Sequence, residues 1–285
     1  TIGLIMDGIK NIKSPALRYH GSKFRLAKWV ISFFPEHHTY VEPFGGGAGI
    51  LLRKQRSYAE IYNDIDEDIV NFFRVIRDPE LNNQLRNLCA LTPYARAEFR
   101  AALTESADPV ERARRTAVRA MMGFGSAGAT QKDNGFSIDA KRKYKTVMDV
   151  WARYPDRLAA IGERFTGVLI ENRPATQVMR QHDAESTLHN VDPPYLPTTR
   201  DKGGNRRYRH EMSEEDHIIL LQELRSLQGY VVLSGYDSEL YNDLLPEWHK
   251  SQTKSRISAG RGTKVNTECV WLNPQCVEQL ARDLI

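Results

Sequence analysis

Residues 187–195 read Thr-Leu-His-Asn-Val-Asp-Pro-Pro-Tyr, a short apolar run that ends in an acid, two prolines and an aromatic ring. The run Thr187 to Val191 fits the end of a buried strand. Because proline cannot continue a helix and donates no ladder hydrogen bond, the strand ends at Asp192 and the following turn is stiff. In an open α/β sheet, ligands bind beyond the carboxyl ends of the strands. We therefore expect Asp192 to lie at a ligand site.

The four residues Asp192 to Tyr195 combine groups that suit a planar ring carrying an amine. The Asp192 carboxylate can accept a hydrogen bond from an amino group, and the Pro193 carbonyl can accept a second. Tyr195 offers a flat apolar surface against which the ring can lie. The alternative is an ordinary Asp-Pro-Pro turn with Tyr195 at the protein boundary, and these four residues alone leave both interpretations open.

A glycine cluster follows the run Thr39 to Pro43 and precedes a helix-compatible run, Ile50-Leu51-Leu52. Glycines allow sharp turns and let a ligand approach the main chain without a Cβ in the way. Such strand-to-helix turns bind dinucleotides, phosphates and nucleosides alike, so the signal is weak alone, and a plain structural loop is the alternative. The cluster reads Phe44-Gly45-Gly46-Gly47-Ala48-Gly49.

A second strand is predicted around Ile61 and Tyr62, with Asp64 near its end. An acid in that position can accept hydrogen bonds from ribose hydroxyls, as in dinucleotide-binding folds. The alternative role for Asp64 is the N-cap of a helix predicted at 67–76. The neighbouring acids at 66–68 suit the first turn of that helix.

Tyr19-His20-Gly21-Ser22-Lys23 precedes a helical run predicted from Phe24 to Phe34. The first glycine of a phosphate-binding Walker loop is absent, which argues against binding of a nucleoside triphosphate here. Lys23, near the start of a helix, suits a carboxylate or phosphate partner. A solvated surface lysine is the alternative.

Taken in order, these segments resemble the DNA adenine-N6 methyltransferases of the Dam type. The resemblance runs along most of the chain, since Val232 to Asp237 is similar to the strand and loop on the far side of that family's base pocket. It implies S-adenosylmethionine as cofactor, double-stranded DNA as substrate, and an adenine flipped out of the duplex. Three departures stand out: Tyr19 replaces a tryptophan, Ala48 replaces a glycine, and residues 171–174 replace an acid-aromatic pair near the cofactor's adenine.

The resemblance also implies roles for individual residues. The catalytic tetrapeptide consists of Asp192, Pro193, Pro194 and Tyr195. The expected cofactor contacts are Tyr19, Lys23, Phe44, Gly45, Gly46, Gly47, Asp64 and Asp192. It does not say which residues hold the adenine ring of the cofactor.

The strand-helix alternation predicts a doubly wound, Rossmann-like α/β sheet interrupted once. Residues 1–75 and 165–285 form the catalytic domain, including a helix at 213–227 with Ser213 as N-cap. Residues 76–164 form a mainly helical insertion, with helices at 79–99 and 109–122. Asn134-Gly135 predicts a hairpin turn there. By resemblance, the insertion recognises the target, and its polar residues suit base edges: Ser126, Thr130, Gln131, Lys132 and Asn134.

The chain of 285 residues carries a net charge of only +4, with a sequence pI near 8.9. Positive charge must therefore be concentrated to attract a polyanion. It is concentrated at 112–119, at 141–145, and in a basic loop at 198–209, which either closes over the extruded nucleotide or is simply solvated. The expected DNA contacts in these runs are Lys141, Arg142, Lys143, Lys145, Arg206 and Arg207.

Composition also narrows the function classes. The three cysteines, Cys89, Cys269 and Cys276, lie outside the motifs, which argues against carbon-5 cytosine chemistry. His37-His38 lacks a metal-ligand spacing, so we expect no metal. No membrane span and no signal peptide are predicted, and we expect a cytoplasmic protein of bacterial or phage origin, monomeric or weakly dimeric. The rival hypotheses are a cytosine-N4 or RNA-adenine methyltransferase, a non-catalytic DNA-binding regulator and, more distantly, a nicotinamide oxidoreductase.

Overall fold

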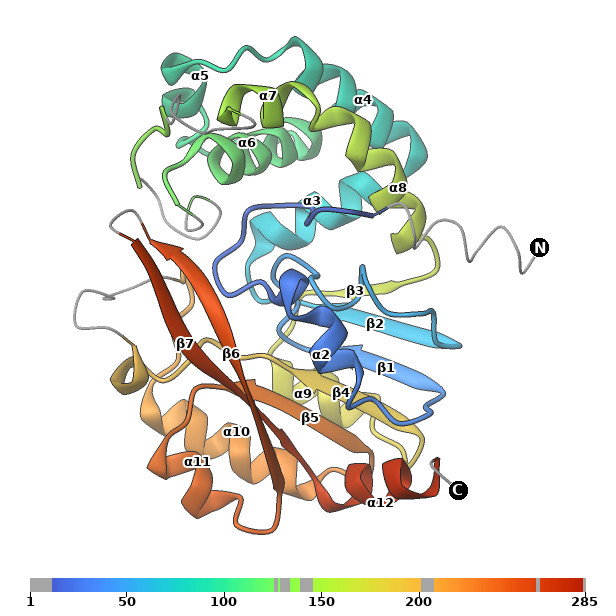
Figure 1. Ribbon diagram of the computed structural model, residues 1–285. Helices are drawn as coiled ribbons and strands as arrows, with labels where there is room; N and C mark the ends of the chain where they lie inside the picture. Colours follow the sequence, from blue (N-terminus) through green and yellow to red (C-terminus); the bar gives the residue numbers. More distant parts are fainter. Residues whose placement is uncertain are drawn as a thin grey trace.

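The computed structural model describes residues 12–125, 128, 134–138, 146–200, 208–259 and 262–283. Within them, seven strands form one sheet in the order β3-β2-β1-β4-β5-β7-β6 (Figure 1). The first five strands in that order are parallel, while β7 runs antiparallel to both of its neighbours. The predicted α/β class is confirmed. The strands are β1 Thr39–Glu42, β2 Ala59–Asn63, β3 Leu169–Glu171, β4 Thr187–Val191, β5 Tyr230–Gly235, β6 His249–Ala259 and β7 Gly262–Leu272.

Most of the predicted helices form close to their expected positions. The Ser213 hydroxyl accepts a hydrogen bond from the Asp216 amide and completes a capping box, as its position before three acids predicts. The described helices are η1 Lys23–Arg25, α2 Ala27–Ile31, α3 Glu67–Arg77, α4 Pro79–Leu91, α5 Arg96–Ala101, α6 Pro109–Met122, α7 Val147–Ala152, α8 Pro155–Phe165, α9 Ala175–Gln181, η2 Pro197–Thr199, α10 Glu214–Ser226, α11 Glu239–Leu244 and α12 Pro274–Arg282.

The sheet has a hydrophobic core on each face, because neighbouring residues of a strand point to opposite sides. In β5, Val231 and Leu233 pack with α9, α10 and α11, whereas Val232 faces the core that includes α2 and α12. In β7, Trp271 belongs to the first of these cores and Val270 to the second. Helices therefore cover both faces, which is the doubly wound arrangement (Figure 1).

The order of the strands places a topological switch between β1 and β4. The chain passes from β1 to β2 on one side, and it returns to β4 on the other. Val41 in β1 is opposite His189 in β4, so both strands run out at the same edge of the sheet. In open α/β sheets this edge, at the switch, is where ligands bind. The glycine cluster follows β1 there and Asp192 follows β4.

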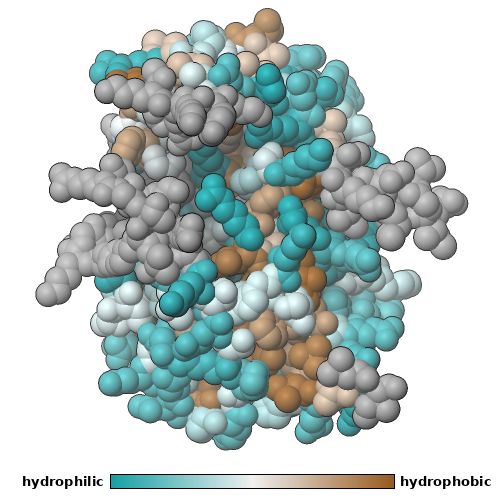
Figure 2. Space-filling view, viewed as in Figure 1, coloured by the Kyte–Doolittle hydropathy of each residue, from teal (hydrophilic) through white to brown (hydrophobic). Residues whose placement is uncertain are grey.

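Helices α4 to α8 lie between β2 and β3 in the chain and form a layer beyond α3 (Figure 1). In the same view, hydrophilic side chains cover most of the surface over α4 and α8 (Figure 2). We propose that this layer belongs to an inserted recognition domain, as the sequence suggests.

The arginines of α6 do not form an open basic surface, so the expectation for residues 112–119 is wrong. Asp68 on α3 binds the guanidinium groups of Arg112 at 2.6 Å and Arg119 at 2.8 Å. Glu111 binds Arg114 and Arg115, each at 2.7 Å. The Asp68 pairs hold α6 against α3, the Glu111 pairs lie within α6, and Arg114 also binds Glu98 of α5 at 3.0 Å.

Four other expectations differ from the structure. The glycine cluster continues as a series of turns up to Arg53 rather than a helix. The helix predicted at 79–99 is two helices, α4 and α5, separated at residues 92–95. The single helix predicted from Phe24 is a short 3-10 turn followed by α2. The N-cap of α3 is Asp66, whose carboxylate accepts from the Asp68 amide, and not Asp64.

Candidate active site

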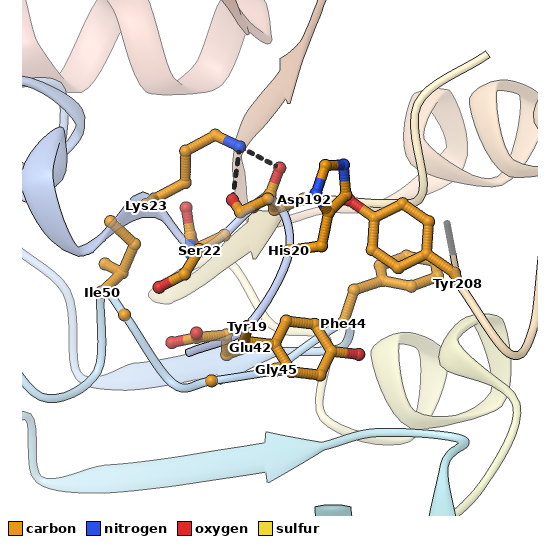
Figure 3. A pocket seen from close by; sticks show the side chains of 15 residues that line it. Tyr19, His20, Ser22, Lys23, Glu42, Phe44, Gly45, Ile50, Asp192 and Tyr208 are labelled. Carbon is orange, nitrogen blue, oxygen red and sulfur yellow. Dashed lines mark hydrogen bonds and ion pairs between the residues drawn. The ribbon is translucent and has the colours of Figure 1, made fainter. Parts of the chain in front are cut away.

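Lys23 and Asp192 meet at the edge of the sheet, although 168 positions separate them in the chain. The Lys23 ammonium lies 3.0 Å from Asp192 Oδ1 and donates to the Gly21 carbonyl at 3.0 Å (Figure 3). Both side chains are largely removed from water, with 6% and 19% of their surface exposed. Burial alone would lower the pKa of Lys23, but the Asp192 and Glu268 carboxylates outweigh it and raise that pKa. Lys23 is therefore a cation in this site.

Glu268 on β7 is a second buried acid beside Lys23. Its Oε2 accepts a hydrogen bond from the Tyr195 hydroxyl at 2.8 Å and lies 3.9 Å from the Lys23 ammonium. The same ammonium lies 4.6 Å from the centroid of the Tyr195 ring. The Tyr236 ring packs against the Tyr195 ring in an edge-to-face arrangement, with 4.6 Å between the two ring centroids. Tyr195 is thus buried, with its hydroxyl and one side of its ring already engaged. With both carboxyl groups ionised, Lys23, Asp192 and Glu268 together have one formal negative charge in excess.

The glycine cluster is required by close packing. A Cβ on Gly45 would come within 2.1 Å of the Tyr62 ring, whose hydroxyl donates to the Gly46 carbonyl at 2.6 Å. Gly46 has φ +47°, and a Cβ there would lie 2.6 Å from the Tyr19 ring. The loop therefore runs between two aromatic rings, and only glycine fits at these two positions.

Asp64 supports this loop from the end of β2. One carboxylate oxygen accepts from the Gly46 amide at 2.7 Å and the other from the Asp66 amide at 2.8 Å. Burial raises the pKa of Asp64 to about 6, although these backbone amides oppose the shift. A carboxylate has about four acceptor positions, so a ribose contact is compatible with both hydrogen bonds. We propose that Asp64 serves both the loop and the ribose.

Glu42 is a buried acid at the end of β1. Its Oε2 accepts from the Tyr40 hydroxyl at 2.7 Å and from the Leu51 amide at 3.1 Å. Burial raises the pKa of Glu42 to about 8, although both hydrogen bonds oppose the shift. At neutral pH Glu42 is therefore mainly a neutral acid within the pocket lining.

This raised pKa predicts a change in stability with pH. An unfolded glutamate ionises near pH ~4.3, so at higher pH, up to about 8, the folded state keeps a proton that the unfolded state has lost. Stability then falls as pH rises, by up to about 1.4 kcal/mol per pH unit. Glu42→Gln removes this dependence. Urea unfolding of both proteins should show that the free energy of unfolding of the variant increases relative to that of the wild type as the pH rises from about 5 to about 8. Parallel pH profiles would contradict the prediction.

One pocket brings together seven of the expected site residues. Its walls also include Ser22, Glu42, Asn190 and Tyr208, and its internal volume is about 40 Å³, room for only a few water molecules. The Tyr208 hydroxyl packs closely against Gly21, and a pocket of this volume is too small for a nucleoside. Entry of a nucleoside therefore requires aromatic side chains in the pocket wall to move. The expected residues in the lining are Tyr19, Lys23, Phe44, Gly45, Gly46, Gly47 and Asp192; those outside it are Asp64, Pro193, Pro194 and Tyr195.

Only part of the expected DNA-binding set can be placed. Asn134 donates from its amide to the Phe124 carbonyl at 2.5 Å, next to an antiparallel bridge between Gly123 and Phe136. In the basic loop, Arg200 pairs with Glu211 at 2.7 Å. The following residues lie outside the described part of the chain: Ser126, Thr130, Gln131, Lys132, Lys141, Arg142, Lys143, Lys145, Arg206 and Arg207.

Sequence comparison agrees with the site geometry. Residues 19–257 match the model of the D12 class N6 adenine-specific DNA methyltransferase family. The chain belongs to this family. D12 class enzymes methylate adenine in DNA and generally use S-adenosylmethionine. A search of curated proteins found no match. The matched range includes the glycine cluster, the Asp-Pro-Pro-Tyr segment and α4 to α8.

Two further observations concern metal sites and membrane spans. Among the described residues, no cluster of three or more histidine, cysteine, aspartate or glutamate side chains is arranged to hold a metal ion. No described helix combines the length and the apolar character needed to cross a membrane.

Sequence reasoning missed five residues of this D12 class site: Ser22, Glu42, Asn190, Tyr208 and Glu268. Glu42 and Asn190 each lie next to a quoted motif, and a polar residue within an otherwise apolar buried strand was the available signal. Glu268 had no such signal, because its strand was not predicted. Tyr208 lies in a basic run, and the basic residues of that run predicted phosphate contacts rather than a pocket wall.

Proposed function

We propose that this protein transfers a methyl group from S-adenosylmethionine to the N6 amino group of an adenine flipped out of double-stranded DNA. One observation carries the proposal: the Asp192 carboxyl group and the glycine loop after β1 line the same pocket, at the switch point of the sheet. Membership of the D12 class supports the same reaction.

The glycine loop, Tyr19, Lys23 and Phe44 suit the cofactor, and three features favour the fit. The loop lets a ligand approach the main chain, buried polar atoms face the pocket, and the charge of Lys23, Asp192 and Glu268 is negative overall. When bound, S-adenosylmethionine supplies an electrophilic methyl group on a positively charged sulfur. A site with net negative charge stabilises such a cation.

Asp192 and Pro193 act on the adenine amine. Its nitrogen is a poor nucleophile because the lone pair is delocalised into the ring. Hydrogen bonds accepted by the Asp192 carboxylate and the Pro193 carbonyl would favour a pyramidal nitrogen and stabilise the positive charge that develops on it. To serve this role, Asp192 must share its oxygens between Lys23 and the substrate.

Tyr195 orients the base in this proposal. Its hydrogen bond to Glu268 and its edge contact with Tyr236 hold the ring in place. A fixed aromatic ring against the adenine keeps the amine in line with the methyl group, and holding reactants in such a geometry contributes several kcal/mol, roughly 7–11 in the best cases. Lys23 lies near one side of the ring, so the base would use the other side.

A labelling experiment tests the function. The purified protein is incubated with methyl-labelled S-adenosylmethionine and unmethylated duplex DNA, and the nucleosides are then analysed. We expect label in N6-methyladenine. Label in N4-methylcytosine, or in RNA but not in DNA, would replace the proposal by the corresponding alternative. Cofactor binding without label in any nucleic acid would favour a non-catalytic regulator.

The DNA-contacting residues and the target sequence belong to the same proposal. The polar and basic residues at 126–145 and 206–207 suit contacts with bases and phosphates. We propose that the helical layer and its hairpin recognise a specific site, which mapping of the labelled positions in the DNA would reveal.

A further inference from the structure

Three polar side-chain atoms in the wall of the pocket lack a hydrogen-bond partner within the protein. One is Asp192 Oδ1, which has the Lys23 ammonium as an ion-pair partner at 3.0 Å. The other two are Asn190 Oδ1, in a side chain that is 99% buried, and Ser22 Oγ, which is itself buried. Both residues line the pocket together with Lys23 and Asp192. Since a buried acceptor without a partner is unfavourable, such an atom in a ligand pocket suggests a hydrogen-bond donor on the ligand.

Asn190 is next to a chain of hydrogen bonds that begins at Tyr40. Burial and Glu42 raise the pKa of Tyr40, and a hydrogen bond with Asn190 opposes them. The Tyr40 hydroxyl donates in turn to Glu42, which also receives the Leu51 amide. Asn190 Oδ1 accepts no hydrogen bond from the protein, so it is available to accept one from a ligand.

The charge around these atoms favours a cation. Lys23 is flanked by Asp192 at 3.0 Å and Glu268 at 3.9 Å, which leaves one negative charge in excess. An amide oxygen accepts but cannot donate, and therefore it binds N–H groups rather than a carboxylate. Ser22 Oγ lies beside the glycine loop, 2.9 Å from where a Cβ on Gly49 would stand. Ser22 Oγ thus lies on the glycine-loop side of the pocket, and Asn190 lines the same pocket from β4.

We propose that Asn190 and Ser22 bind the α-ammonium group of the methionyl part of S-adenosylmethionine. This inference rests on the proposed function and adds to it the residues that recognise one end of the cofactor. The ammonium group offers three N–H donors on a positive charge, which matches two orphan acceptors in a site of negative net charge. Asn190 precedes Asp192 by two positions on β4, so this end of the cofactor lies beside the reacting amine.

Binding assays with the intact protein test the inference. By isothermal titration calorimetry, we compare S-adenosylhomocysteine with 5′-methylthioadenosine, which lacks the amino-acid part. Asn190→Ala should weaken S-adenosylhomocysteine roughly 10- to 100-fold, the range for a hydrogen bond to a charged group. Binding of 5′-methylthioadenosine should change less than about twofold. Ser22→Ala should act in the same direction with a smaller factor.

A variant on the same strand serves as the control. Thr187 donates to the His182 carbonyl and does not line the pocket, so Thr187→Val should leave both affinities unchanged. Equal weakening of both ligands by Asn190→Ala, or no weakening of either, would overturn the inference while leaving the proposed function standing. Failure of the wild type to bind either nucleoside or S-adenosylmethionine would overturn the proposed function itself, and the inference with it.

Discussion

Asp192→Ala should remove most of the methyl-transfer activity while the protein stays folded and retains measurable affinity for its cofactor. The substitution removes the proposed carboxylate acceptor for the adenine amine, and loss of one preorganised group at a developing charge costs roughly 10²- to 10³-fold in turnover. Cofactor affinity should fall less than turnover. The measurement combines single-turnover labelling of duplex DNA with calorimetric titration of S-adenosylhomocysteine.

Asp192→Asn refines this experiment, since asparagine keeps the shape and one acceptor oxygen but loses the charge. We expect partial activity, above that of the alanine variant. Lys23 should remain charged in both variants because Glu268 still lies 3.9 Å away, so the fold should survive. Wild-type turnover in Asp192→Ala would show that this carboxylate has no part in the reaction.

Glu60→Gln should destabilise the protein by about 3–5 kcal/mol, the usual cost of removing one member of a buried ion pair. The Glu60 carboxylate on β2 accepts from Arg164 on α8 at 2.6 and 2.9 Å and from Lys54 at 2.8 Å. All three side chains are at most 3% exposed. Without the carboxylate, Arg164 becomes a buried charge with no acid against it.

An exposed ion pair provides the matched control. Glu247 lies 3.3 Å from Arg225, and the two side chains are about half exposed. Pairs in water contribute little, so Glu247→Gln should change stability by less than about 1 kcal/mol. Urea unfolding of the three proteins gives the comparison. Similar losses for both substitutions would mean that burial of the Glu60 cluster does not determine its contribution.

Local sequence signals were sufficient for the parallel half of the sheet. The prolines after Asp192 end β4, the glycines end β1, and the acids after Ser213 begin α10; each acts over a few residues. The hairpin of β6 and β7 gave no such signal. Polar residues and glycines dominate residues 250–264; β6 forms by pairing with β7, and β7 joins the sheet by pairing its residues 269–272 with β5, a contact that no local pattern reveals.

The same contrast applies to the site. Motif order brought Lys23, the glycine loop and Asp192 into one prediction, and the pocket contains all of them. Motifs cannot say which atoms already have partners. Lys23 binding Asp192, Asp64 binding the Gly46 amide and Glu268 binding Tyr195 follow from distances across the sheet. For the arginines of α6 the sequence predicted an open basic surface, which was wrong. Their acidic partners come from other helices as well as from α6, and the local sequence does not show the partners on other helices.

The position of Glu268 has a consequence for biosynthesis. The pocket draws on residues near 20, 45 and 190, and the acid that completes its charge balance arrives only with β7, after the five parallel strands β1 to β5 have already been made. A ribosome-bound chain that stops before this strand holds Lys23 and Asp192 but lacks the carboxylate that anchors Tyr195. Maturation of the centre is thus coupled to insertion of β7 between β5 and β6, a long-range pairing that forms slowly. The newly made enzyme should acquire catalytic competence late, after most of its helices are in place.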